Sequence, residues 1–411
     1  MPVTTRAGDG VDSRYAWMRL AAAVSLSTLG GVGLWSIVVA LPAVQAEFGT
    51  ARADASLPYT LTTLGFAVGG VLMGRLADRF GVIAPVLLGT VCLALGYVLS
   101  SRAGSMTQFA VIHGALIGLL GSCATFGPVV ADTSLWFRRR RGFAVSLAAS
   151  GNYFAGAVWP PLVQAGIAEY GWRQTHVVIG IACLCLMLPL ALVLRRPAPR
   201  QEAPVAMAGG AVAGAPLGLA PNALQTLLAI AGIACCIAMA MPQVHIVAYC
   251  VDLGYGPARG AEMLSVMLAF GVISRLSFGA ILDRIGSVAT LLLSASLQAV
   301  ALALFLPFDG LVSLYAVSAV FGLFQGGIVS TYAVIVRENV PAREVGVRVG
   351  IALSATLIGM AIGGWMSGLA FDLTGSYRAA VVNGIAWNAV TIAIAAWLVL
   401  RRRARERVAY A

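Results

Sequence analysis

Two stretches of the sequence decide the fold: Gly74–Gly81 reads GRLADRFG, and Gly279–Gly286 reads GAILDRIG. They begin 205 residues apart in a chain of 411 residues, and four of their eight positions are identical. A second pair shows the same offset, because Tyr170–Arg173 (YGWR) and Gly375–Arg378 (GSYR) end in arginines that are also 205 residues apart. An internal repeat of half the chain predicts two similar halves.

The composition places the chain in a membrane. Of its residues, 60% are apolar and 10% are charged, and the mean hydropathy is +0.90. Soluble globular domains carry about 25% charged residues, so these values exclude a disordered chain, a coiled coil and an ordinary cytosolic enzyme. A soluble core of this size cannot hide so much apolar surface, and we therefore expect the lipid bilayer to surround the protein.

Twelve apolar runs are each long enough to cross a bilayer, which takes about 20 residues. Only helices and closed barrels span lipid, and continuous runs without alternation indicate helices. The polar segment 1–17 precedes the first run, which is too long for the core of a secretory signal and is interpreted as a retained helix. The predicted spans are 18–41, 57–77, 84–103, 107–133, 143–167, 175–194, 222–251, 260–282, 288–307, 310–336, 347–371 and 378–400.

The one long connection, 195–221, is rich in Pro, Ala and Gly and predicts a flexible cytoplasmic linker between two halves. The predicted domains are a cytoplasmic N-tail (1–17), a six-helix bundle (18–194), the linker, a second six-helix bundle (222–400) and a cytoplasmic C-tail (401–411). Because the two repeats run in parallel, the bundles are expected to face each other across a central cavity with the substrate site near the midplane.

Arginines are distributed unevenly between the two ends of the predicted helices. With the spans placed as above, 21 arginines fall on the side of the two termini and 5 fall on the opposite side. Positive residues favour the cytoplasmic side of a membrane. The count therefore predicts a multi-pass protein of the inner (plasma) membrane with both termini in the cytoplasm. Separately, we expect the protein to function as a monomer.

Several other classes of site are not expected. All 27 basic residues are arginine, and runs such as 138–141 and 401–403 lie beside apolar segments, where they act as topology anchors and do not form a nucleic-acid-binding face. The seven cysteines fall inside apolar runs without the spacing of a metal site. The sequence contains no lysine and thus no phosphate-binding loop of the ATPase type, so we expect no cofactor, no metal and transport driven by a gradient.

The repeated motif and three further segments carry a family resemblance. GRLADRFG at 74–81, between the second and third spans, is similar to the loop 2–3 signature of the major facilitator superfamily. Within that superfamily, Trp35–Gly49, Trp136–Gly151 and His245–Gly254 resemble the monocarboxylate and oxalate–formate exchanger group. The resemblance implies an all-α membrane protein with twelve helices in two pseudo-symmetric six-helix bundles that transports by alternating access.

The repeated motif is expected to control conformation and not to bind substrate. Gly81 can turn the chain sharply, and charges at a helix end can pair with each other or with neighbouring helix termini. By resemblance, the motif forms a conformational latch that comprises Gly74, Asp78, Arg79, Gly81, Asp283 and Arg284. For Arg75, a topology anchor beside a tight turn is an equally compatible interpretation.

Arg275 is the most informative residue of the sequence. It precedes Asp283, at the cytoplasmic end of the eighth span, by eight residues, a rise of about 12 Å, whereas half a hydrocarbon core measures about 15 Å. We therefore expect its guanidinium near the midplane, where an arginine costs at least ~2.5 kcal/mol and where its planar fork suits a carboxylate. An internal ion pair is the alternative, although no acidic residue is an obvious midplane partner. By resemblance, the eighth-helix arginine of the group binds the substrate carboxylate.

Four other residues are candidates for contact with the substrate, and one more for carrying a proton. His245 could bind substrate or carry a coupling proton, because imidazole titrates near neutrality. A histidine that only packs against its neighbours is the alternative. His113 is a second candidate for carrying the proton. Asn152 and Tyr332 could line the cavity or make interhelical hydrogen bonds. Phe126 falls where related bacterial lactate carriers place a tyrosine, which favours a larger or more apolar acid.

The predicted function is secondary active transport of a small organic anion, a monocarboxylate in the first instance. Proton coupling through the aspartate of animal monocarboxylate carriers is not implied, because Gly271 occupies its position. One alternative is efflux of hydrophobic drugs or toxic metabolites by the same fold. The other is a non-transporting membrane sensor or a membrane enzyme, but the sequence has neither a substantial soluble output domain nor clustered nucleophiles or metal ligands.

Overall fold

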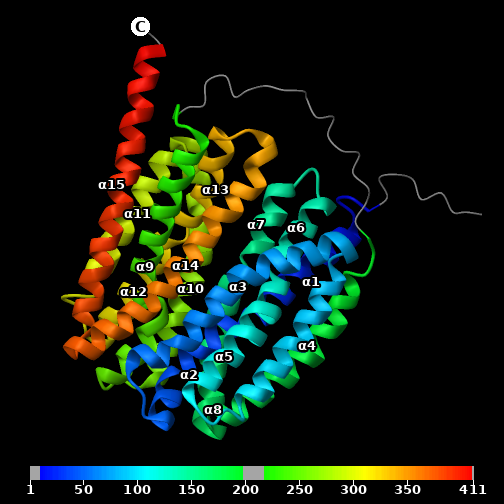
Figure 1. The fold of residues 1–411 in the computed structure, drawn as a ribbon, viewed down its shortest axis with the longest axis vertical. Coiled ribbons are helices and arrows are strands. Elements are labelled where there is room, and N and C mark those ends of the chain that lie inside the picture. Colours follow the sequence, from blue (N-terminus) through cyan, green and yellow to red (C-terminus); the bar gives the residue numbers. More distant parts are fainter. Residues whose placement is uncertain (1–9, 198–216, 410–411) are drawn as a thin grey trace, which may run out of the picture. The chain divides into compact units, whose positions relative to one another are not determined.

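The computed structural model describes residues 10–197 and 217–409, and within these two ranges every regular element is a helix (Figure 1). This confirms the predicted all-α class. Long apolar runs form helices in lipid because each backbone N–H and C=O must find its partner within the segment. Residues 1–9 of the predicted N-tail and residues 198–216 of the predicted linker lie outside the described residues.

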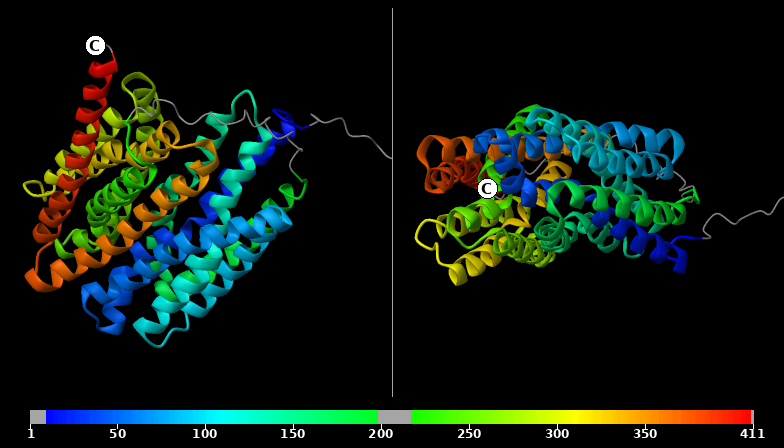
Figure 2. Two further views of the ribbon diagram at one scale, coloured as in Figure 1. Left: turned by 45° about the horizontal axis from the view of Figure 1, so that its top comes forward. Right: turned by 90° about the horizontal axis from the view of Figure 1, so that it is seen from below.

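Two compact units make up the chain, and each is a bundle of long helices (Figures 1 and 2). The first unit comprises Met1–Ala40 and Leu61–Ala208, and the second comprises Leu41–Thr60 and Gly209–Ala411. We call residues 41–60 the hairpin. The hairpin belongs to the second unit although it lies in the first half of the sequence, so the two helices that it joins each contribute to both units.

The helices of the first half begin at residues that suit a helix N-terminus. The Ser13 hydroxyl accepts a hydrogen bond from the N–H of Ala16, and that of Ser105 accepts one from the N–H of Gln108, which caps two helices. In order, the elements are α1 (Arg14–Gly30), α2 (Val32–Phe48), α3 (Arg52–Phe80), α4 (Ile83–Ser100), α5 (Met106–Ile112), the π-helix η1 (His113–Gly121), the 3₁₀ helix η2 (Ser122–Thr125), α6 (Gly127–Trp136), α7 (Arg141–Ala149) and α8 (Gly151–Val193).

The second half continues with α9 (Pro221–Asp252), α10 (Pro257–Ile285), α11 (Ser287–Ala303), α12 (Leu311–Gln325), α13 (Ile328–Asn339), α14 (Ala342–Thr374) and α15 (Tyr377–Ala409). Proline opens α9 and α10 because its missing N–H has no partner at a helix start in any case. We call the end of this unit at Asp252 and Pro257 the hairpin end, and the opposite end, at Pro221 and Ile285, the linker end.

Ten helices within the described residues are long and apolar enough to cross a membrane. One of them, Arg141–Val193, has 53 residues, and Gly171 divides it with a non-helical backbone conformation (φ 76°, ψ 162°). A further apolar helix, α11, has 17 residues. The second part of Arg141–Val193 and α11 correspond to the remaining two of the twelve predicted spans.

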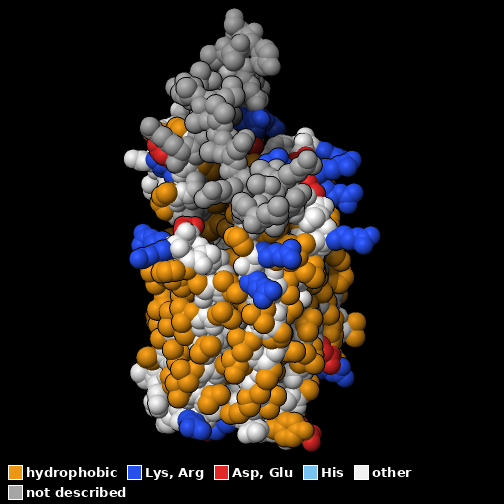
Figure 3. Space-filling view, turned by 90° about the vertical axis from the view of Figure 1, so that its right-hand side faces the viewer, with side chains coloured by type: hydrophobic (Ala, Val, Ile, Leu, Met, Phe, Trp, Pro, Cys, Tyr) orange, Lys and Arg blue, Asp and Glu red, His pale blue; other side chains and the backbone are white. Residues whose placement is uncertain are grey.

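Apolar side chains cover the flanks of the helices. In the face shown in Figure 3, hydrophobic side chains form a band across the middle, and arginines lie above and below it. Exposed aliphatic side chains include Val91 and Leu95 on α4 and Leu186 and Leu192 on α8. Such a surface is stable in lipid and not in water, in keeping with a multi-pass membrane protein.

The two copies of the repeat share backbone geometry. Gly81 (φ +80°) and Gly286 (φ +82°) both take a conformation that favours glycine, and their N–H groups bond to the carbonyls of Ala77 and Leu282, which are again 205 residues apart. The arginines of the second pair also match, because Arg173 donates to the carbonyl of Ser101 and Arg378 to that of Leu306. These equivalent bonds support the pseudo-symmetry of the halves.

Candidate functional site

Irregular backbone occurs at the same place in both halves. In the first half, the π-helix η1 ends at Gly121, and a short 3₁₀ helix leads to Phe126. In the second half, α12 stops at Gln325 and leaves Gly326 and Gly327 outside the helices. Gly121 and Gly326 are 205 residues apart. Interrupted helices at corresponding positions of two repeats point to the binding region of a transporter, because irregular backbone is tolerated in a membrane only where protein or a cavity covers it.

Phe126 lies directly at the break of the first half. Phe126 follows the 3₁₀ helix and precedes α6. Its side chain is half-buried, and its ring centroid lies 5.9 Å from that of Phe66 on α3. The break thus presents an aromatic side chain next to another helix of the first unit. Its proposed contact with a substrate stays a prediction.

The break of the second half is tied to α10, the helix that carries Arg275. The hydroxyl of Ser274 accepts a hydrogen bond from the N–H of Gly326 at 3.0 Å. A Cβ on Gly326 would lie 2.7 Å from the carbonyl oxygen of Gly271, so the two helices touch through their backbones. Arg275 is the next residue of α10; it is half-buried and interacts with neighbouring groups of the protein.

His245 and Tyr332 both lie inside the second unit, where they are fully buried. His245 bonds through Nδ1 to the hydroxyl of Tyr377 (3.1 Å) and through Nε2 to the carbonyl of Gly364 (2.8 Å). The Tyr332 hydroxyl donates to the Sγ atom of Cys235 at 3.3 Å. The two residues therefore belong to different hydrogen-bonded groups, and the structure does not bring them into contact with each other.

His113 opens the π-helix and is fully buried among aromatic rings. Its ring centroid lies 4.4 Å from that of Phe109 and 5.6 Å from that of His176. Within the described ranges, neither ring nitrogen of His113 has a hydrogen-bond partner. His176 is also fully buried, and its Nδ1 bonds to the hydroxyl of Ser100.

Asn152 lies near the start of α8, and its carbonyl accepts a hydrogen bond from the Trp35 side chain at 3.0 Å. A Cβ on the neighbouring Gly151 would collide with the side chain of Ser27 on α1, so α8 and α1 pack closely here. The amide group of Asn152 is half-buried, and its predicted role in binding substrate stays a prediction.

The predicted latch residues lie at two equivalent helix ends. Gly74, Asp78 and Arg79 belong to the last turns of α3, where Asp78 and Arg79 are exposed. Asp283 and Arg284 are exposed in the last turn of α10. Each helix ends at the positive-φ glycine of its repeat, as the motif predicts.

Arg19, one of the 21 arginines counted on the side of the two termini, is a buried structural group. Only 3% of the residue is exposed, and its Nη2 atom forms an ion pair with Asp132 at 2.6 Å. The guanidinium also stacks over Trp136, with Cζ 4.3 Å from the ring centroid. The pair joins α1 to α6 inside the first unit.

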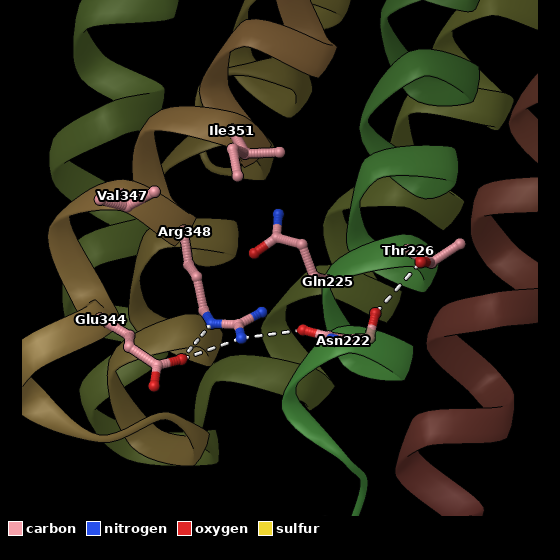
Figure 4. Close-up of a pocket in the computed structure, with 7 residues that line it drawn as sticks. All are labelled: Asn222, Gln225, Thr226, Glu344, Val347, Arg348 and Ile351. Atoms are coloured by element: carbon pink, nitrogen blue, oxygen red, sulfur yellow. Dashed lines mark hydrogen bonds and ion pairs between the residues drawn. The ribbon is translucent and has the colours of Figure 1, made fainter.

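A cavity of about 470 Å³ with polar and aliphatic lining residues lies at the linker end of the second unit (Figure 4). Its arginine, Arg348, already bonds to Glu344 at 2.9 Å and to the side chain of Asn222 at 2.9 Å. The charge of this guanidinium is thus neutralised within the protein, and the cavity lacks the unbalanced charge that would attract an anion. Among the described residues, no group of three metal-ligating side chains is found either.

A third cluster joins the hairpin to the hairpin end of α9, α14 and α15, and the sequence analysis missed it. Arg52 forms hydrogen bonds with both carboxylate oxygens of Asp252 and with the hydroxyl of Tyr377. Asp372 accepts hydrogen bonds from the backbone N–H groups of Arg52 and Ala53. Three charged residues and a tyrosine at the ends of four separate helices gave no spacing signal that could have connected them.

Comparisons with known proteins agree with this architecture. A cattle protein named monocarboxylate transporter 13 is 30% identical over 382 residues, which is 90% of this chain and 86% of the relative. The human monocarboxylate transporter 11 is 27% identical over 63% of this chain and 54% of the relative. A fungal MFS-type transporter of Gibberella moniliformis is 26% identical over 82% of this chain and 83% of the relative.

A solved structure has a similar fold. The crystal structure of a bacterial homologue of the human lysosomal transporter Spinster superposes with a TM-score of 0.71 over 95% of this chain and 98% of that chain, at 14% sequence identity. At this identity the similarity concerns the fold alone. The sequence model of the Major Facilitator Superfamily matches residues 23–317 and 263–410, and the chain therefore belongs to this superfamily of membrane transporters and is not an enzyme.

Proposed function

We propose that this transporter moves a small organic anion, a monocarboxylate, and that Arg275 binds the carboxylate. Arg275 lies four residues from the midpoint of α10 (Pro257–Ile285), or about 6 Å along the helix axis. Hydrocarbon does not solvate a guanidinium at that depth, so the group requires water, protein dipoles or an anion. The central position of this charge in an apolar span is the observation that carries the proposal.

The chemistry of the side chain favours a carboxylate over other cargoes. A guanidinium presents parallel N–H groups that match the two oxygens of a carboxylate, whereas a neutral hydrophobic compound offers no partner for them. The neighbouring residue Ser274 is engaged by Gly326, which holds this part of α10 against the break of the second half. The names of the monocarboxylate transporter relatives support the same substrate class.

The proposal includes secondary active transport by alternating access in the plasma membrane, with the protein working as a monomer. The linker end is assigned to the cytoplasm, because arginines gather there in the second unit. These are Arg284, Arg337, Arg348, Arg401, Arg402, Arg403 and Arg405, against Arg52 in the hairpin and Arg259 and Arg378 beside it. Positive residues are retained on the cytoplasmic side during insertion.

Uptake of radiolabelled monocarboxylates into proteoliposomes tests the assignment of Arg275. Arg275→Lys keeps the charge but removes the planar fork, and we expect uptake to fall by about 10- to 100-fold, since a charged hydrogen bond contributes about 1.5–3 kcal/mol. Arg259→Lys is the matched control on the same helix, because Arg259 is exposed and pairs with Glu262. It should transport like the unmodified protein.

Two results would overturn the proposal. One is that Arg275→Lys and Arg275→Gln, both shown to be folded by gel filtration, transport carboxylates at the unmodified rate. The other is that no monocarboxylate is transported with or without a pH gradient, while a neutral hydrophobic dye is exported equally well by both Arg275 variants. The latter result would favour drug efflux by the same fold.

A further inference from the structure

The guanidinium of Arg52 holds the tip of the hairpin on the second unit. Its Nη1 and Nη2 atoms bond to the two carboxylate oxygens of Asp252 at 3.1 and 3.2 Å, and Nη1 also donates to the Tyr377 hydroxyl at 2.7 Å. The Arg52 Cζ atom lies 4.6 Å from the ring centroid of Phe371, and only 8% of the residue is exposed. A bidentate, stacked and buried arginine is a specific attachment and not a surface ion pair.

Asp372 forms a second attachment at the same place. Its two carboxylate oxygens accept the backbone N–H groups of Arg52 and Ala53, both at 2.8 Å. These N–H groups belong to the first turn of α3, whose N-terminus carries partial positive charge. Gly368 permits the approach, because a Cβ there would lie 2.9 Å from the Cα and N atoms of Ala53. The hairpin thus contributes positive charge, and the second half contributes the two carboxylates.

A hydrogen-bonded chain leads from this attachment to His245. Arginine can only donate, so the Tyr377 oxygen accepts from Arg52 and its own hydrogen is available for Nδ1 of His245, 3.1 Å away. The carbonyl of Gly364 can only accept, so Nε2 of His245 carries the proton at 2.8 Å. The bonds are therefore satisfied when His245 is neutral and protonated on Nε2.

We propose that Arg52, Asp252, Asp372, Tyr377 and His245 form a proton-sensitive lock that holds the hairpin on α9, α14 and α15 within the second unit. We call this cluster the hairpin lock. It concerns conformational control and does not depend on which substrate is transported. The helices α2 and α3 continue from the hairpin into the first unit. Protonation of His245 in the second unit can therefore affect two helices that contribute to both units.

Protonation of His245 opposes the locked state in two ways. A proton on Nδ1 would face the hydrogen of the Tyr377 hydroxyl, which must then turn away and lose its acceptor. The new positive charge would also lie on the second half, near the carboxylates that bind Arg52 and the α3 N-terminus, and it would weaken their attraction for these two positive groups. The charged and titratable groups around the imidazole are Arg52 and the α3 N-terminus, Asp252 on α9, Asp372 on α14 and Tyr377 on α15.

The same charges act in the reverse direction. Departure of the hairpin removes Arg52 and the helix terminus from the carboxylates, which then favour a protonated imidazole. Because coupling between two equilibria is reciprocal, release of the hairpin increases the affinity of His245 for a proton. The hairpin lock could in this way couple proton uptake to the change of conformation.

Amide hydrogen exchange measures the hairpin lock directly and needs no substrate. In the full-length protein in lipid nanodiscs, peptides covering residues 48–60 report whether the N–H groups of Arg52 and Ala53 are bonded. Protection is expressed relative to the intrinsic exchange rate at each pH. We expect protection to fall by about tenfold between about pH 8 and about pH 5, the range in which histidine titrates.

Three variants identify the cause. His245→Gln cannot take up a proton and should remove the pH dependence; Tyr377→Phe, which leaves His245 in place but interrupts the chain, should weaken it. Gly368→Ala should lower protection at every pH, because its methyl group displaces Ala53. Gly350→Ala is the matched control in the same helix, since a Cβ there meets nothing within 4 Å.

Two outcomes overturn the hairpin lock. One is protection that does not vary with pH in the unmodified protein. The other is an unchanged pH dependence in both His245→Gln and Tyr377→Phe, which would assign the effect to the carboxylates. Hydrogen exchange is measured without substrate. A failure to observe carboxylate uptake would therefore count neither for nor against the hairpin lock.

Discussion

The hydroxyl of Ser274 accepts the backbone N–H of Gly326 at 3.0 Å, and this bond ties α10 to the break between α12 and α13. The side chain supplies an acceptor to a backbone group at the point where the regular helix has stopped. Because Ser274 directly precedes Arg275, this bond places the break beside the part of α10 that carries the arginine. The geometry of the proposed anion site thus depends on close packing of two backbones.

Gly326→Ala is expected to destabilise the protein by about 1–3 kcal/mol, as overpacking typically does. The added Cβ would lie 2.7 Å from both the Gly271 oxygen and the Ser274 Cβ, so the helices must separate. Gly279→Ala on the same α10 is the control, because its Cβ would meet nothing within 4 Å. Thermal unfolding in detergent measures both; equal melting temperatures would contradict the close contact.

Asp132→Asn is expected to destabilise the first unit by about 3–5 kcal/mol, because it leaves the buried charge of Arg19 without its partner. The control is Glu262→Gln, which removes the exposed ion pair with Arg259 and should cost about 0–1 kcal/mol. Chemical unfolding of both variants provides the measurement. If the two substitutions lower the free energy of unfolding equally, water solvates the Arg19 guanidinium and the Arg19–Asp132 pair does not behave as a buried ion pair.

The positions of the helices could be predicted because hydropathy reflects the lipid environment directly. The predicted span 260–282 corresponds to α10, Pro257–Ile285, and the difference arises because a proline and a positive-φ glycine set the ends. The breaks at Gly121 and Gly326 could not be predicted, since they lie in apolar runs whose hydropathy does not change. The pattern of backbone bonds there depends on which helix packs alongside.

The candidate site was predictable only where a charged residue occurs within an apolar run. Arg275 is visible in the sequence because a charge interrupts an apolar run. Arg52 gives no such signal, since charged residues are expected at the ends of membrane helices, and its partner Tyr377 follows 325 positions later. The ion pair of Arg19 gives no signal for the same reason, because Asp132 is distant in the sequence.

Gly81→Ala and Gly286→Ala are expected to destabilise the protein by about 1–3 kcal/mol each, the usual cost of a strained backbone conformation. Both glycines have φ near +80°, and a Cβ on Gly81 meets nothing within 4 Å, so backbone strain alone accounts for the effect there. Gly74→Ala, at a helical position that is equally open, should be neutral or slightly stabilising. Thermal melting distinguishes them, and a neutral Gly81→Ala would refute the strain argument.

His113→Phe is expected to leave the pH dependence of transport unchanged, although His113 is one of two proton candidates. Its imidazole is packed against Phe109, and in the described part of the chain its nitrogens have no hydrogen-bond partner that could pass on a proton. A phenyl ring of similar volume should fit the same site and cost less than about 1.5 kcal/mol. His245, in contrast, bonds through Nδ1 to Tyr377 of the hairpin lock and through Nε2 to the carbonyl of Gly364. Initial uptake rates of a radiolabelled monocarboxylate, measured from about pH 5 to about pH 8, compare His113→Phe with His245→Gln in the same vesicles. A flat profile for His113→Phe beside a normal profile for His245→Gln would transfer the proton-carrying role to the aromatic cluster of the first unit.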